Sequence, residues 1–316
     1  MTALSFVYLI GGAAILMFAG DALVKGAIGI SLRSGLSATF VSLTVVALGT
    51  SLPEMIVSVQ AALQGSTDIA LGNVIGSNVA NILLILGVPA LILAVKTSAA
   101  EQKRNALMML AATGAFAAVA WTGEISRIAG IGFLLGLLFI ISLSLYLSKN
   151  NPIEADDSDT NAANLSVQKL CGYLLIGVIG LPIGAQGLIT GAKAIALSVG
   201  LSETAVGLTV IALGTSLPEL AASVAAAMRG RTDVIMGNVI GSNLMNIMAI
   251  IGVTSIITPM AVTSTLVLTD ITLLLGITSI LTLVVIAKWP IGKGIGIAFL
   301  AGYGVFTWLA ISHSAG

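Results

Sequence analysis

The chain has 316 residues, of which 57% are hydrophobic and only 8% are charged, and its formal net charge is zero. Soluble domains carry about 25% charged residues, so this composition excludes a water-exposed globular surface, and its hydrophobicity excludes intrinsic disorder. A nucleic-acid partner is excluded too, because the chain has no excess of positive charge to neutralise phosphates. The composition therefore predicts a membrane protein.

Long apolar runs without alternation predict membrane-spanning helices. A helix needs about 20 apolar residues to cross a bilayer, whereas a barrel strand needs about ten alternating ones. The runs here fit the first case, so we expect an all-α polytopic membrane protein. In chain order, the ten expected spans are residues 5–30, 36–63, 69–95, 105–122, 128–147, 168–198, 202–228, 234–258, 266–287 and 291–312.

The basic residues predict how these spans are oriented. In the ten-span arrangement, the loops on one side hold all Lys and Arg residues except Arg127 and Lys193. The positive-inside rule makes that side cytoplasmic. We therefore expect a multi-pass protein of the cell (inner) membrane, in contact with membrane lipid, with both termini outside the cytoplasm.

The chain repeats itself at a fixed offset. Residues 43–54 read LTVVALGTSLPE and residues 208–219 read LTVIALGTSLPE, so eleven of twelve positions are identical at an offset of 165. The same offset relates the segment GNVIGSN at 72–78 to its copy at 237–243. A duplication of this length and identity predicts two structurally equivalent halves.

Each half holds five expected spans, and this odd number inverts the second copy. The second half enters the membrane from the opposite side, which gives an inverted repeat of the kind found in many secondary transporters. We expect a first five-helix repeat at 1–148, a cytoplasmic linker at 149–166, and a second, inverted five-helix repeat at 167–316.

Each repeat carries a proline followed by a glutamate well inside an apolar run. Pro53 and Pro218 each lack an N–H and crowd the preceding turn, so each should break its helix and free backbone carbonyls. Glu54 and Glu219 stand next to these breaks. An ionised side chain at membrane depth is costly, so both glutamates are candidates for ion binding rather than structural acids.

Other oxygen-bearing side chains surround each glutamate in the sequence. They are Thr50, Ser51, Ser77 and Asn81 in the first half, and Thr215, Ser216, Ser242 and Asn246 in the second. Spacings of four residues, as from 77 to 81 and from 242 to 246, place two side chains on one helix face. Carboxylates, amides, hydroxyls and carbonyls without His or Cys suit hard cations such as Ca²⁺ and Na⁺, so we expect no cofactor.

The duplicated GTSLPE and GN-x-x-GSN-x-x-N segments resemble the two alpha-repeats of prokaryotic sodium/calcium exchangers, in the calcium/cation antiporter superfamily. The resemblance implies that the second, third, seventh and eighth helices hold the ions. It also implies backbone ligands at Ala47 and Ala212, beside the side chains named above. Some family members have Asp at one of the positions occupied here by Asn81 and Asn246, so this chain keeps two central acids.

Three classes of function compete for this sequence. An intramembrane enzyme is not expected, because no nucleophile or cofactor motif is evident. A channel is not expected either, because an inverted repeat gives one site two alternative accesses, which a channel does not need. We therefore predict a secondary antiporter that exchanges Ca²⁺ for Na⁺ by alternating access and works as a monomer. Exchange of Ca²⁺, or of another cation, for H⁺ is the alternative, because protons can also neutralise Glu54 and Glu219.

The first and sixth spans are long and rich in glycine. At about 26 and 31 residues, they exceed the roughly 20 needed to cross, so we expect them to tilt. Small residues also allow close sliding, so we expect both spans to move across a static core, with tight static packing as the alternative. Within the first span, Asp21 precedes Lys25 by one helical turn, and this spacing predicts an ion pair.

Overall fold

The computed structural model describes residues 3–148, 165–198, 212–263 and 267–314. Nearly all of this part of the chain is helical, and strands are limited to two short segments. The mostly helical, membrane-type fold is therefore confirmed. Most of the expected linker at 149–166 and the first ten residues of the expected span 202–228 lie outside the described residues.

The helices follow the expected spans closely. In the first half they are α1 (Ala3–Ser34), α2 (Ala38–Val41), the π-helix η1 (Ser42–Val46), α3 (Ala47–Thr50), α4 (Leu52–Leu63), α5 (Thr67–Leu83), α6 (Gly87–Ile92), α7 (Ala100–Ala120) and α8 (Arg127–Ser148). In the second half they are α10 (Val167–Ser198), α12 (Ala212–Gly214), α13 (Leu217–Met228), α14 (Thr232–Leu244), the π-helix η4 (Met245–Ile250), α15 (Ile251–Ile257), the π-helix η5 (Val267–Ile271), α17 (Thr272–Ile286) and α18 (Lys293–Ser314).

Six helical stretches in the described residues are long and apolar enough to cross a membrane. They are Leu4–Ser34, Thr67–Ile92, Arg127–Ser148, Val167–Ser198, Thr232–Ile257 and Thr269–Ile286. A seventh is the bent pair Ala38–Thr50 and Leu52–Leu63. Ten crossings stay a prediction, because at the remaining expected spans the helical segments within the described ranges are shorter or less apolar.

The outer faces of these helices are apolar. Along α8, the exposed fractions are 82% for Ile128, 61% for Leu135 and 66% for Phe139. A soluble protein would bury such a continuous apolar face, so this surface suits contact with lipid tails.

Two short backbone pairings tie loops of the first half to loops of the second. Strand β1 (Glu124–Ile125) pairs antiparallel with β2 (Met260–Ala261), with Ile125 opposite Met260, and Val95 forms a bridge with Ile291. The offset of 165 relates Val95 to Met260, and it relates Ile125 to the residue just before Ile291. The two pairings therefore occupy near-equivalent places in the two halves.

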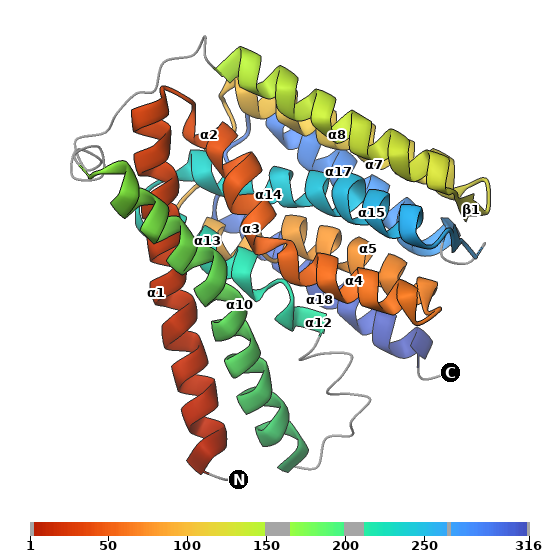
Figure 1. Cartoon of the computed structure of the whole chain (residues 1–316), viewed down its shortest axis with the longest axis horizontal. Helices are drawn as coiled ribbons and strands as arrows, with labels where there is room; N and C mark the ends of the chain where they lie inside the picture. The colour runs from red at the N-terminus through yellow and green to blue at the C-terminus, as the bar shows by residue number, and fades with distance from the viewer. Residues whose placement is uncertain (1–2, 149–164, 199–211, 264–266, 315–316) are drawn as a thin grey trace.

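α1 and α10 form a pair that crosses the other helices steeply (Figure 1). Glycines let their backbones touch: a Cβ atom on Gly184 would lie 2.8 Å from the backbone nitrogen of Leu16 and 3.0 Å from the carbonyl oxygen of Gly12. Gly20 instead faces the carbonyl oxygen of Ala221 in α13. We expected the glycines of both helices to form sliding surfaces toward the core, but most of those in contact join the two helices to each other.

This packing predicts a sharp difference between two glycines of α10. We expect Gly184→Ala to lower the melting temperature of the purified protein, because the added methyl meets backbone atoms of α1, and such overpacking costs about 1–3 kcal/mol. The matched control is Gly172→Ala, whose methyl would meet nothing within 4 Å. Equal melting temperatures for the two variants would contradict the pairing.

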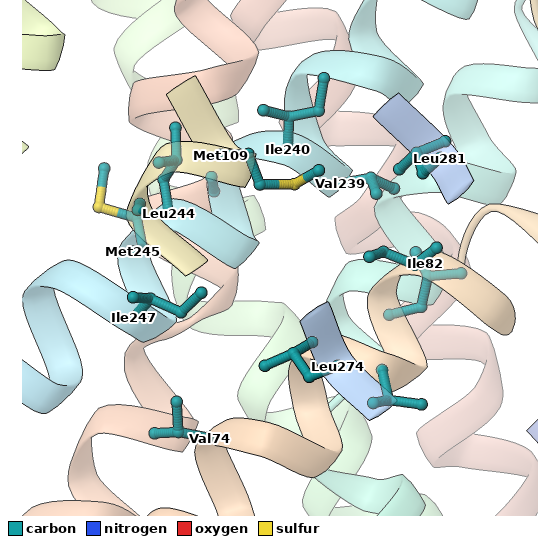
Figure 2. Packing of buried hydrophobic residues seen from close by; sticks show 14 of the residues in the cluster. Val74, Ile82, Met109, Val239, Ile240, Leu244, Met245, Ile247, Leu274 and Leu281 are labelled. Atoms are coloured by element: carbon teal, nitrogen blue, oxygen red, sulfur yellow. The ribbon is translucent and has the colours of Figure 1, made fainter. Parts of the chain in front are cut away.

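The core is built around α5 and α14. Figure 2 shows Val74 and Ile82 of α5, Val239 of α14, Met109 of α7 and Leu281 of α17 among its buried side chains. All five of these side chains are 0% exposed. Tight apolar packing of this kind holds α5 and α14 in place, and these two helices carry the polar GN-x-x-GSN segments.

Candidate ion-binding site

The helix that carries Glu54 is broken where the sequence predicts. α3 ends at Thr50 and α4 begins at Leu52, and the two segments are bent by 47°. Pro53 lies in the first turn of α4, where its missing N–H leaves the Gly49 carbonyl without a helical partner. In the second half, α12 ends at Gly214 and α13 begins at Leu217 with a proline in its first turn, so this break is confirmed as well.

The two glutamates next to these breaks are buried. Glu54 and Glu219 are each 1% exposed. Among the described residues, no group donates a hydrogen bond to either side-chain oxygen of Glu54 or to Oε2 of Glu219. A buried carboxylate without partners is costly, and a cation would satisfy these oxygens.

A hydroxyl of the first half reaches the carboxylate of the second. The Oγ of Ser51 donates to Oε1 of Glu219 at 3.1 Å, and the side chain of Thr50 lies beside the same carboxylate. The equivalent hydroxyls of the second half, on Thr215 and Ser216, have no hydrogen-bond partner in the described part of the chain. Only one of the two equivalent links between the halves is therefore made.

The amide side chains of α5 and α14 show the same asymmetry. The Nδ2 of Asn81 donates to Oδ1 of Asn243 at 3.3 Å, which again joins the halves. The equivalent bond would run from Nδ2 of Asn246 to Oδ1 of Asn78, but that oxygen accepts no hydrogen bond from the described residues. Both amide atoms of Asn246 are buried and lack a partner within the described ranges.

One asparagine, itself bonded to a serine, holds the backbone carbonyl of each glutamate. The Nδ2 of Asn73 donates to the Glu54 carbonyl at 3.2 Å and to the Ser58 hydroxyl at 2.9 Å. Asn238 repeats this with the Glu219 carbonyl at 3.3 Å and with the hydroxyl of Ser223, which is the counterpart of Ser58. These four residues were not among the predicted site residues, although the offset of 165 pairs asparagine with asparagine and serine with serine.

Most of the predicted ligand residues are buried. Those with an exposed fraction of 5% or less are Ala47, Thr50, Ser51, Glu54, Ser77, Asn81, Ser216, Glu219, Ser242 and Asn246. Thr215 is half-buried, and Ala212 lies at the start of α12. Hydrogen bonds join Ser51 to Glu219 and Asn81 to Asn243, and Asn243 was not among the predicted ligands.

A cavity of about 360 Å³ lies between α4, α10 and α12, beside the two helix breaks. It is lined by Leu52, Pro53, Ile56, Val57, Pro182, Ala185, Gln186, Ile189, Gly214 and Thr215. Thr215 is the one predicted ligand residue in this lining, and neither Glu54 nor Glu219 is part of it.

The family model described as sodium/calcium exchanger protein matches residues 4–146 and 169–312. The chain belongs to the sodium/calcium exchanger family. Among its relatives, the sodium/calcium exchanger MaX1 of Methanosarcina acetivorans is 30% identical, with 97% of this chain and 98% of MaX1 covered. The inner membrane protein YrbG of Escherichia coli K12 is 33% identical, with 96% of this chain and 95% of YrbG covered.

The solved structures of this exchanger family share the fold. A structure of the sodium-calcium exchanger NCX_Mj, soaked without Na⁺ and Ca²⁺, has a TM-score of 0.85 at 33% sequence identity. The match covers 96% of this chain and 98% of NCX_Mj. The chain is therefore a multi-pass membrane antiporter of cations and not an enzyme, as the sequence predicted.

Proposed function

We propose that this exchanger-family protein moves Ca²⁺ in one direction and Na⁺ in the other, with the ions bound between Glu54 and Glu219. The observation that carries the proposal is that three carboxylate oxygens of these buried residues have no protein partner within the described ranges. They lie beside two broken helices, close in sequence to the hydroxyl groups and backbone carbonyls that we propose as further ligands. The proposed ligands are Ala47, Thr50, Ser51, Glu54, Ser77, Asn81, Ala212, Thr215, Ser216, Glu219, Ser242 and Asn246.

The charge of the site explains why exchange would be obligatory. Two ionised carboxylates in a low-dielectric interior are costly to move past a barrier without a counter-charge. One Ca²⁺, or two or more Na⁺, would neutralise them and permit the change of access. Ca²⁺ takes six to eight oxygen ligands, which this set of carboxylates, amides, hydroxyls and carbonyls can provide. The names of MaX1 and NCX_Mj, both sodium/calcium exchangers, support the same ions.

The direct test is calcium uptake into everted membrane vesicles that contain the protein. An outward-directed sodium gradient, with the proton gradient collapsed by an ionophore, should drive uptake of Ca²⁺. Vesicles without the protein provide the background. Uptake driven only by a proton gradient would instead favour exchange of Ca²⁺ for H⁺.

The asymmetric hydrogen bonds support alternating access. In the proposed cycle, the links from Ser51 to Glu219 and from Asn81 to Asn243 belong to one access state, and their equivalents from Ser216 and Asn246 belong to the other. The inverted arrangement of the halves makes these two sets interchangeable. The distribution of Lys and Arg supports the proposed orientation in the inner membrane, with both termini outside the cytoplasm, and we propose that a monomer is the working unit.

This cycle predicts that two equivalent serines affect Ca²⁺ binding from opposite sides of the membrane. Ser51→Ala should weaken Ca²⁺ binding from one side of the membrane by about tenfold, because a hydrogen bond to a charged group contributes about 1.5–3 kcal/mol. Ser216→Ala should weaken binding from the other side. The measurement is the KM for Ca²⁺ at each face of oriented proteoliposomes. The same side dependence in both variants would contradict the proposed interchange.

A further inference from the structure

In each half, one asparagine ties the helix that carries the glutamate to the helix that follows it. The side-chain amide nitrogen of Asn73 in α5 has two N–H donors. It donates to the Glu54 carbonyl at 3.2 Å and to the Ser58 hydroxyl at 2.9 Å. Glu54 and Ser58 lie one helical turn apart in α4, so the amide fixes α4 to α5 at two points.

The tying asparagine shares a helix face with proposed ligands. Asn73 precedes Ser77 by four residues and Asn81 by eight, so the three side chains lie on one side of α5. Glu54 lies in the first turn of α4, where backbone N–H groups have no partner within the helix and other contacts must hold the chain. The bonds from Asn73 therefore set where Glu54 stands relative to Ser77 and Asn81.

The second half repeats this contact with nearly the same geometry. Asn238 of α14 donates to the Glu219 carbonyl at 3.3 Å and to the Ser223 hydroxyl at 2.9 Å. Ser58 and Ser223 are both 0% exposed, so water does not compete for their hydroxyls. The contact thus differs from the link between Ser51 and Glu219, which is made in only one of its two equivalent forms.

This difference between the contacts indicates which of them last through the transport cycle. In an inverted repeat, the two halves hold at one moment the two conformations that each half adopts in turn. A contact made in only one half should therefore break and re-form during the cycle. A contact made equally in both halves should be kept in both access states, and the bonds of Asn73 and Asn238 meet this criterion.

We propose that Asn73 and Asn238 are positioning residues that hold Glu54 and Glu219 in ion-binding geometry in both access states. Their amide nitrogens donate to protein oxygens, so these residues act through the glutamate backbone and not as ligands of the ion. The inference rests on the proposed function. It adds a constant part to a site whose links between the halves change with access.

The test measures the KM for Ca²⁺ at each face of oriented proteoliposomes that contain the full-length protein. Asn73→Ala and Asn238→Ala should each raise the KM about tenfold at both faces, which corresponds to about 1.4 kcal/mol. The maximal rate should stay near that of the wild type. A purely structural role would lower the amount of folded protein, and so the maximal rate, without moving the KM. An unchanged KM, or a rise at one face only, would overturn the proposal.

Ser58→Ala provides a second variant that keeps the test valid if Asn73→Ala folds poorly. It removes one of the two acceptors and should raise the KM about threefold at both faces. The double variant should match Asn73→Ala alone, because both changes act on one contact. Independent effects of the two changes, which would multiply in the double variant, would also overturn the proposal.

The matched control is Asn105→Ala, which removes a buried asparagine side chain from α7. Asn105 is 0% exposed, and neither of its amide atoms has a hydrogen-bond partner among the described residues. This variant should keep the wild-type KM at both faces, and a rise equal to that of Asn73→Ala would count against a specific role for the tie.

The wild-type protein separates a failure of this inference from a failure of the proposed function. All rates are measured with the cation gradient that drives wild-type calcium uptake, so the comparison holds for coupling to Na⁺ or to H⁺. Wild-type protein that moves no Ca²⁺ under either gradient would contradict the proposed function and this inference together. Wild-type transport with an unchanged KM in the asparagine variants would contradict the inference alone.

Discussion

Replacing Glu54 by glutamine should reduce sodium-driven calcium transport by at least about 100-fold. Breaking a buried charge pairing costs about 3–5 kcal/mol, and each 1.4 kcal/mol is a factor of ten. The variant leaves Glu219 as the only carboxylate of the pair, so one Ca²⁺ would no longer be neutralised. The amide would also present N–H groups to the cation. The measurement is the initial rate of calcium uptake in proteoliposomes.

The matched control is Glu124→Gln, which makes the same chemical change on an exposed residue of β1. It should transport at the wild-type rate. Glu219→Gln should be as inactive as Glu54→Gln, because both carboxylates are proposed to share the ion. Calcium exchange at the wild-type rate in Glu54→Gln would contradict this account of the site.

Fixing α1 to the core should stop exchange, whereas fixing α1 to α10 should not. The structure supplies a contact for each case. Asp21 of α1 pairs with Arg229, which follows α13, at 2.6 Å, and Lys25 lies 3.3 Å from the hydroxyl of Tyr173 in α10. The predicted ion pair between Asp21 and Lys25 is wrong, because Asp21 pairs with Arg229 and Lys25 donates to Tyr173.

The experiment replaces each pair by cysteines, in a background where Cys171 is changed to serine because it is exposed. A short bifunctional thiol reagent then links Cys at positions 21 and 229. This link should stop calcium exchange but leave equilibrium binding of Ca²⁺ intact, since shear between the α1–α10 pair and the core is prevented. Reduction of a cleavable reagent should restore transport.

The matched control links cysteines at positions 25 and 173 in the same way. The glycine-lined contact between α1 and α10 makes them a unit, so this link should leave exchange near its unlinked rate. Undiminished exchange after complete linkage of positions 21 and 229 would remove the sliding model. Loss of exchange in the control would show that α1 and α10 move separately.

The local features of this protein could be predicted from the sequence because single residues determine them. Pro53 and Pro218 break their helices wherever the rest of the chain lies, since the missing N–H is a local property. The duplication then identified Glu54 and Glu219 together, and both are buried beside a break. The lengths of the membrane-spanning helices could also be predicted from the sequence, because bilayer thickness sets the length of an apolar run.

The contacts between the halves could not be predicted in the same way. The bonds from Ser51 to Glu219 and from Asn81 to Asn243 depend on how the two halves pack, which no local pattern encodes. The π-helix η4, which contains Asn246, has no characteristic residue type that marks it in advance. Glycines such as Gly184 predicted close packing correctly, but their spacing did not identify the partner helix.

The most direct test of the central proposal is a crystal structure of the protein soaked with Ca²⁺ and recorded for anomalous scattering. The account predicts a calcium peak between Glu54 and Glu219, with oxygens of both carboxylates at about 2.3–2.6 Å. A calcium ion bound elsewhere, or one that contacts only one of the two glutamates, would contradict the shared site.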